Sequence, residues 1–188
     1  MRLFAAVTPP ESAIGELAAA VAPLRSLPGA GRLRWAGPDT WHFTLAFLGE
    51  VDEERLPELA ERLARAAHRH PPHELRFAGG GRFGDRILWA GVQGETDTLR
   101  GLARSAAAGA RRAGVAVDDR RPFHPHLTLA RSATGRVALA PYAAGLADFR
   151  GAPWTAGRLE LIRSRLPAGG VPGERPRYEL VEAWDLGR

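Results

Sequence analysis

The order of strand-like and helix-like segments along the chain restricts its fold more than any other feature. Residues 73–92 have the pattern of two strands joined by a turn rich in Gly and Asp, and residues 158–186 that of two strands joined by a loop rich in Gly and Pro. Helical patterns lie between them. Because the strands come as hairpins mixed with helices, and not in strict alternation, the sequence predicts an α+β fold and not a doubly wound one.

Apolar residues at helical spacing predict three helices, with a fourth, weaker pattern at residues 137–146. The first helix follows a strand at residues 2–7 and is expected to be capped by Thr8, and the third by Thr96 or Asp97. The second is expected to begin at Pro57. The apolar positions expected to face the core are Ile14, Leu17, Ala18, Val21 and Leu24; Leu59, Leu63 and Ala67; and Leu99, Leu102, Ala103, Ala106 and Ala110.

The length of 188 residues and the lack of any long linker predict one domain over residues 1–188, with a surface loop at residues 168–176. The first apolar run is broken by Pro9 and Pro10 and is too short for a signal peptide. No stretch reaches the ~20 apolar residues that span a bilayer. We therefore expect a cytoplasmic protein that has no membrane contact and no obligate protein partner.

The basic composition suggests a nucleic-acid partner, with a formal charge of +5 and a pI near 11. All 26 basic residues are arginine, however, and the chain has neither lysine nor asparagine. This bias is typical of a GC-rich coding sequence, so part of the arginine content reflects the genome. Without lysine, neither a lysyl-adenylate nor a Schiff base can form, and without cysteine there is no thiolate nucleophile or metal ligand.

Two stretches of the chain repeat one short pattern. The segments "WHFTLAFLGE" at residues 41–50 and "RRPFHPHLTLAR" at residues 120–131 match at four of five positions when aligned on His42 and His126. Alternation in a strand would bury Phe43, Leu45 and Phe47 in the first, and Leu127 and Leu129 in the second. The opposite face would then carry an imidazole and a hydroxyl about 7 Å apart, His42 with Thr44 and His126 with Thr128.

Two imidazoles facing each other across a shared cleft are suited to acid–base catalysis. Histidine gains and loses a proton near neutral pH, so one ring can protonate a leaving oxygen while the other takes a proton from water. The two threonine hydroxyls can donate hydrogen bonds to the oxygens of a phosphate between them. Such a site needs no metal, no cofactor and no covalent intermediate, and the reaction it suits is phosphodiester cleavage.

The paired H-x-T-x motifs resemble the two-histidine (2H) phosphoesterase superfamily, and within it the RNA 2′,3′-cyclic phosphodiesterases, the LigT-like or ThpR proteins also named 2′-5′ RNA ligases. The similarity includes "RLFAAVTPP", "RWAGPDTWHFTLAFLGE", "FHPHLTLAR", "LELIRSRL" and "YELVEAWDL". It implies a bilobal α+β fold, in which two lobes of antiparallel sheet with outer helices are related by a pseudo-twofold axis around a central basic cleft. By motif match it implies an active site of His42, Thr44, His126 and Thr128, with Arg131 contacting phosphate.

The resemblance implies hydrolysis of RNA ends with a 2′,3′-cyclic phosphate to a 2′-phosphate, with His42 as proton donor and His126 as proton acceptor. The same site could run the reverse, ATP-independent joining to a 2′-5′ bond. Two alternatives stay open. One is a cyclic phosphodiesterase acting on small nucleotides such as ADP-ribose 1″,2″-cyclic phosphate. The other is a non-catalytic module that binds RNA or nucleotides, although binding alone needs no paired acid and base.

Other histidines, glycines and aromatic residues have simpler interpretations. His124 could form a metal clip with His126, but no further ligand lies at matched spacing, so a position at the edge of the cleft or a structural role is favoured. His68, His70 and His73 are explained by the end of a helix. The glycine-rich residues 79–84 lack a P-loop lysine and are interpreted as a turn. For Trp35, Trp41 and Phe123, base stacking and core packing both stay open.

Overall fold

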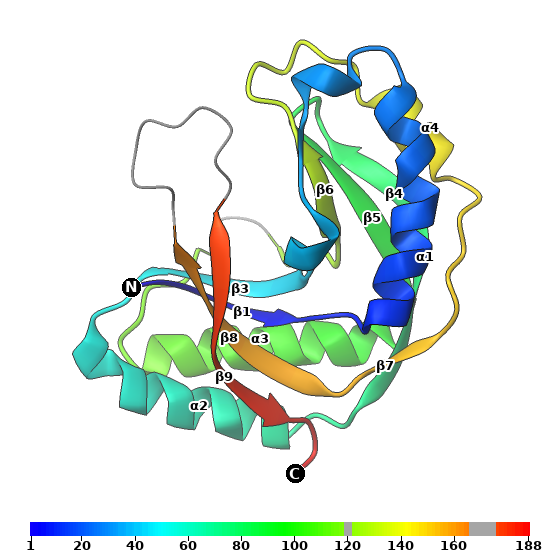
Figure 1. Ribbon diagram of the computed structural model, residues 1–188. Coiled ribbons are helices and arrows are strands. Elements are labelled where there is room, and N and C mark those ends of the chain that lie inside the picture. Colours follow the sequence, from blue (N-terminus) through cyan, green and yellow to red (C-terminus); the bar gives the residue numbers. More distant parts are fainter. Residues whose placement is uncertain (119–121, 166–175) are drawn as a thin grey trace.

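Two antiparallel sheets form the framework of the protein (Figure 1). The computed structural model describes residues 1–118, 122–165 and 176–188. The first sheet has the strand order β3-β1-β8-β9 and the second β2-β6-β5-β4-β7. In chain order the strands are β1 (Arg2–Val7), β2 (Arg34–Trp35), β3 (Phe43–Glu50), β4 (His73–Phe83), β5 (Ile87–Gly94), β6 (Leu127–Arg131), β7 (Trp154–Ala156), β8 (Arg158–Arg165) and β9 (Arg177–Asp185). The predicted α+β class is confirmed, and residues 168–175 of the expected loop lie outside the described residues.

Helices lie along the outside of both sheets. α2 (Leu56–His68) packs on α3 (Thr96–Arg112), and they contact β9 and β3 of the first sheet. α1 (Glu11–Val21) and α4 (Ala140–Gly145) contact β4 of the second sheet, on the other side of the molecule in Figure 1. Short 3₁₀ helices at Ala22–Ser26, Ala30–Arg32, Pro38–Thr40 and Glu53–Arg55 lie in the connections.

The expected core positions of α2 and α3 are all buried, whereas the predicted caps are wrong. Thr8 Oγ1 donates to Glu160 Oε2 at 2.6 Å, across the sheet, so Pro10 takes the N-cap position of α1. Glu95 takes that position in α3, and no side chain caps it. Both caps were predicted from local sequence, but the hydrogen bond of Thr8 is decided by its neighbour on β8.

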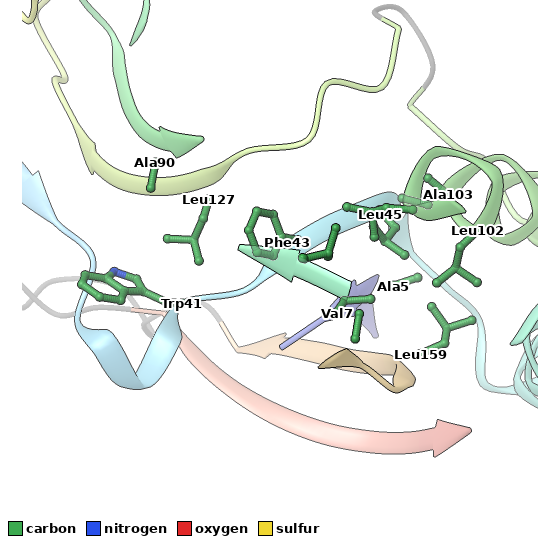
Figure 2. Close-up of a cluster of buried hydrophobic side chains, with 14 of the residues drawn as sticks. Ala5, Val7, Trp41, Phe43, Leu45, Ala90, Leu102, Ala103, Leu127 and Leu159 are labelled. Atoms are coloured by element: carbon green, nitrogen blue, oxygen red, sulfur yellow. The ribbon is translucent and has the colours of Figure 1, made fainter. Parts of the chain in front are cut away.

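One buried cluster joins the two sheets and contains the residues that flank both histidine motifs. The chain leaves the second sheet at Trp35, turns through Pro38–Thr40 and enters the first sheet at Phe43. Figure 2 shows Trp41 and Phe43 from this crossing in the same cluster as Leu127 of β6. The segments before β3 and β6 are therefore anchored in one core.

Both motif strands contain a β-bulge at the same place. In β3, Ala5 and Ala6 of β1 pair with Ala46 and Thr44, so the partner strand skips Leu45. In β6, Leu88 and Trp89 of β5 pair with Ala130 and Thr128, so Leu129 is skipped. A bulge reverses the alternation of side chains beyond it. The residue after the alanine therefore joins the face of the histidine and threonine in each strand.

The bulge in β3 corrects one prediction. Strict alternation placed Phe47 in the core with Phe43 and Leu45, but the structure leaves its side chain 53% exposed. Phe47 pairs with Phe4, which lies on the same face of β1 as Ala6, the partner of Thr44. Phe47 therefore lies on the His42 face of the first sheet.

Candidate active site

Each motif histidine sits one residue before its strand, His42 before β3 and His126 before β6. β3 is an edge strand of the first sheet, and β6 lies next to the edge strand β2 of the second. The two motifs thus come from different sheets, which the short crossing from Trp35 to Phe43 joins. Whether the two rings open to one cleft at a separation of roughly 5 to 8 Å stays a prediction.

The same hydrogen bond orients both imidazoles. His42 Nδ1 lies 2.7 Å from the carbonyl oxygen of Thr40, and His126 Nδ1 lies 2.6 Å from that of His124. A carbonyl oxygen can only accept, so Nδ1 carries a hydrogen and donates it in both rings. This leaves Nε2 of each ring to accept a proton from a ligand or to give one up.

Arg131 is the charged group that the two histidines share. Strict alternation would have put the Arg131 side chain on the buried face with Leu127 and Leu129. Because Arg131 lies beyond the bulge in β6, its side chain is instead on the His126 face. The positive charge of Arg131 contributes to lowering the pKa of His42 and of His126. A cation within electrostatic reach of both rings is suited to hold an anion between them.

Burial among aromatic rings sets the proton affinity of His42. Its ring stacks on Phe4 at a centroid distance of 4.6 Å and meets the ring of Tyr178 edge-on at 5.2 Å. Desolvation lowers the pKa of His42 to about 4, against the opposing effect of the Thr40 hydrogen bond and with a further lowering by Arg131. In the ligand-free protein His42 is therefore neutral at pH 7.

His126 has a more open aromatic setting. Its ring meets Phe83 edge-on at 4.9 Å and lies 6.3 Å from Trp89. Burial also lowers the pKa of His126, the His124 carbonyl raises it, and the charges of His124 and Arg131 lower it again. The larger shift belongs to His42, so a single proton shared by the pair would reside on His126 in the ligand-free protein.

Thr44 and Thr128 are half-buried on the histidine faces of their strands. Neither hydroxyl makes a hydrogen bond with another residue of the described part of the chain. Because a hydroxyl can donate one hydrogen bond, each threonine has a donor left for a ligand beside its histidine.

His124 lies beside the site but packs against an aromatic ring. Its ring centroid is 5.0 Å from Trp89 and 6.1 Å from His126. Among the residues that the structure describes, no group of three or more His, Cys, Asp or Glu side chains could hold a metal ion. A cavity of about 280 Å³ opens next to His124 and is lined in part by Trp89, Thr96 and Arg100.

The remaining residues considered from the sequence lie in the framework. Trp41 is buried, and its Nε1 donates to Ala36 O at 3.2 Å. Trp35 donates to Ala30 O at 3.0 Å, and Phe123 packs against the core. Two of the helix-end histidines form hydrogen bonds within the framework: His70 Nε2 lies 2.8 Å from Ser105 Oγ, and His73 Nδ1 donates to Pro71 O at 3.0 Å. The glycine-rich segment is largely strand, since β4 extends to Phe83.

The ring neighbours of the two histidines were not predicted from the sequence. Phe4 comes from β1, Tyr178 from β9, Phe83 from β4 and Trp89 from β5. They lie far from His42 and His126 along the chain, and only the strand order brings them together. Phe4 and Tyr178 both lie in segments that show the family resemblance, "RLFAAVTPP" and "YELVEAWDL", but no local pattern indicated that their rings contact His42.

Comparison with known proteins identifies relatives over most of the chain. The family model described as LigT like Phosphoesterase matches residues 7–89 and 91–172. A protein of Escherichia coli (strain K12) named RNA 2′,3′-cyclic phosphodiesterase is 33% identical over 160 residues, which cover 85% of this chain and 82% of the relative. A Geobacillus stearothermophilus protein of the same name is 32% identical over 156 residues, 81% of this chain and 47% of that protein. The chain thus spans about half the length of the second relative.

Solved structures share the fold along the whole chain. A crystal structure of E. coli LigT complexed with NADP⁺ matches with a TM-score of 0.77 and 28% sequence identity, covering 100% of this chain and 98% of that one. None of the helices within the described ranges is long and apolar enough to cross a membrane.

Proposed function

This chain belongs to the family of LigT-like phosphoesterases, and on that premise we propose that it hydrolyses RNA ends that carry a 2′,3′-cyclic phosphate. The main support is the pair of imidazoles that come from two sheets. In each ring Nδ1 is hydrogen-bonded to a backbone carbonyl, and the charge of Arg131 acts on both rings. One anion-binding residue and two acid–base groups are what cleavage of a phosphodiester by water requires.

In the proposed reaction, the cyclic phosphate lies between His42 and His126. Arg131 and the hydroxyls of Thr44 and Thr128 bind its two non-bridging oxygens. His126 Nε2 takes a proton from a water molecule as the water oxygen attacks phosphorus. The bond from phosphorus to O3′ breaks, and His42 Nε2 gives its proton to O3′. The product is a 2′-phosphate with a free 3′-hydroxyl, and solvent returns the proton from one histidine to the other.

The order of the two pKa values in the ligand-free protein is opposite to these roles, because it places a shared proton on His126 and not on His42. The bound phosphate reverses it in our proposal. A negative charge interacts more strongly with a desolvated ring than with a hydrated one, so the anion should raise the pKa of His42 most. His42 would then hold the proton when substrate is bound and be neutral when it is absent.

The relatives support this substrate class. The E. coli and G. stearothermophilus proteins are named for the same activity. E. coli LigT forms a complex with NADP⁺, a nucleotide whose adenosine ribose carries a 2′-phosphate, the group that the proposed reaction leaves behind. If the 5′-hydroxyl of a second RNA takes the place of water, the same groups would join it to the 2′,3′-cyclic end through a 2′-5′ bond, with His126 taking the proton of that hydroxyl and His42 giving its proton to O3′. Action in the cytoplasm is part of the proposal.

The test is the position of phosphate in the product. An oligoribonucleotide with a 2′,3′-cyclic phosphate is incubated with the purified protein, and the product is separated from 2′- and 3′-phosphate standards. Because the acid is fixed on one strand and the base on another, only one ribose oxygen can face the acid, and we expect 2′-phosphate. Mostly 3′-phosphate would contradict the assigned roles, and no hydrolysis at all would contradict the activity.

A further inference from the structure

A row of four apolar side chains crosses the first sheet on the His42 face. Phe47 of β3 pairs with Phe4 of β1, Phe4 pairs with Ile162 of β8, and Ile162 pairs with Leu180 of β9. The four residues, called the apolar row below, therefore occupy one line across all four strands. The neighbouring line contains Thr44, which pairs with Ala6.

The apolar row is buried at its centre and open at both ends. Phe4 and Ile162 are 4% and 7% exposed, whereas Phe47 and Leu180 are 53% and 55% exposed. Phe4 and Ile162 belong, with Ala6, to a small buried cluster separate from the main core. Large apolar side chains that are exposed beside such a cluster are typical of a binding surface, whereas apolar residues scattered singly over a surface are not.

The apolar row contacts His42 through Phe4. The His42 ring stacks on Phe4, and the Tyr178 ring meets Phe4 edge-on at 5.3 Å. Phe47 lies on the other side of Phe4, with a centroid distance of 6.4 Å. Phe4 itself is covered, so the exposed aromatic rings near a phosphate bound at His42 are those of Tyr178 and Phe47.

Positive charge accompanies the row. Arg2 and Arg131 both act on Tyr178, where their charges oppose the rise in pKa that burial causes. Neither arginine forms an ion pair with a described residue. Aromatic faces beside unpaired arginines are the combination with which sheets bind single-stranded nucleic acid, because every base can stack and every linkage carries a negative charge.

We propose that the apolar row binds bases of the RNA on the 5′ side of the cyclic phosphate, so that the enzyme prefers an oligonucleotide end to a cyclic mononucleotide. The inference rests on the proposed function. Since a 2′,3′-cyclic phosphate lies at the 3′ terminus, all further nucleotides lie on its 5′ side. A mononucleotide has no second base to place on Phe47 or Leu180.

The test compares kcat/KM for a short oligoribonucleotide with a 2′,3′-cyclic phosphate and for the cyclic mononucleotide with the same terminal base. Phe47→Ala should lower the value for the oligonucleotide about 5- to 100-fold, the usual effect of losing one stacked base, and leave that for the mononucleotide unchanged. Phe47→Trp should retain it, because stacking tolerates any large ring. The matched control is Val181→Ala, since Val181 is 41% exposed on the same strand as Leu180 but is the unpaired residue of a bulge.

Three outcomes would overturn the inference. If Phe47→Ala lowers kcat/KM equally for both substrates, Phe47 only supports Phe4 and His42. If it lowers kcat/KM for neither substrate, RNA does not contact the apolar row. If Val181→Ala has as large an effect as Phe47→Ala, the loss reflects general damage to the sheet. If the wild-type protein hydrolyses neither substrate, the proposed function fails. The row is then tested by binding of an oligonucleotide ending in 2′-phosphate, which Phe47→Ala should weaken and Val181→Ala should not.

Discussion

The His42 and His126 halves of the site share their backbone geometry and differ in what surrounds it. Each has a histidine before a strand, a hydrogen bond from Nδ1 to the carbonyl two residues back, and a bulge at the leucine after the threonine. The residue that the bulge places on the face of the histidine and threonine is Phe47 in one half and Arg131 in the other. One half thus offers an aromatic surface and the other a cation.

The difference shows how a repeated motif can give two histidines with unlike proton affinities. The shared hydrogen bond leaves Nε2 available in both rings, so the chemistry is of the same kind. The surroundings decide proton affinity: burial, to which the rings of Phe4 and Tyr178 contribute, lowers the pKa of His42 to about 4, while His126 lies in a more open setting. We expect the two histidines to be equally necessary for activity and to have different pKa values.

Removal of either imidazole tests that they are equally necessary. His42→Ala and His126→Ala should each lower kcat at least ~10²-fold, the usual contribution of a positioned acid or base. The double variant should lose less than the product of the single losses, because both groups act in one event. Steady-state kinetics on a cyclic-phosphate RNA end measure this. Full activity in either single variant would remove that half from the mechanism.

The pH dependence of activity tests whether the pKa values of His42 and His126 differ. Productive protein carries one proton on the pair, so kcat/KM should be bell-shaped, with its maximum between the two ligand-free pKa values and hence below pH 6.5. Above the upper pKa it should fall about tenfold per pH unit. Bound phosphate raises both pKa values, so the bell for kcat should lie at higher pH. Coinciding bells, or a kcat/KM maximum above pH 7, would contradict the role of burial.

The threonines should show a smaller and more symmetric effect. Thr44→Val and Thr128→Val each remove one hydrogen bond to the phosphate while keeping the shape of the side chain, so each should lower kcat/KM about 10-fold. Similar losses in the two variants would support equivalent roles on the two strands. A loss from only one of them would mean that the phosphate lies closer to that half.

Chelation should have the smallest effect. Activity should be unchanged in excess EDTA, because the proposed steps use only imidazole, hydroxyl and guanidinium groups. Loss of activity that zinc or manganese restores would instead assign His124 and His126 to a metal.

Local sequence patterns predicted the parts of the site that depend on local geometry. The H-x-T-x spacing was enough to place an imidazole and a hydroxyl on one face, and helical spacing identified the buried faces of α2 and α3. The bulges were not predictable in this way, because a partner strand decides which residue it skips. The exposure of Phe47, the position of Arg131 and the aromatic neighbours of His42 all follow from strand pairing between distant segments.

A crystal structure with a bound 2′-phosphorylated nucleotide tests most directly whether histidines from two sheets act on one phosphate. We predict that Nε2 of His42 and Nε2 of His126 each lie about 3 Å from oxygens of the same phosphate group, which places the rings roughly 5 to 8 Å apart. A phosphate that contacts only one of the two rings, or rings that open to different surfaces, would contradict the account.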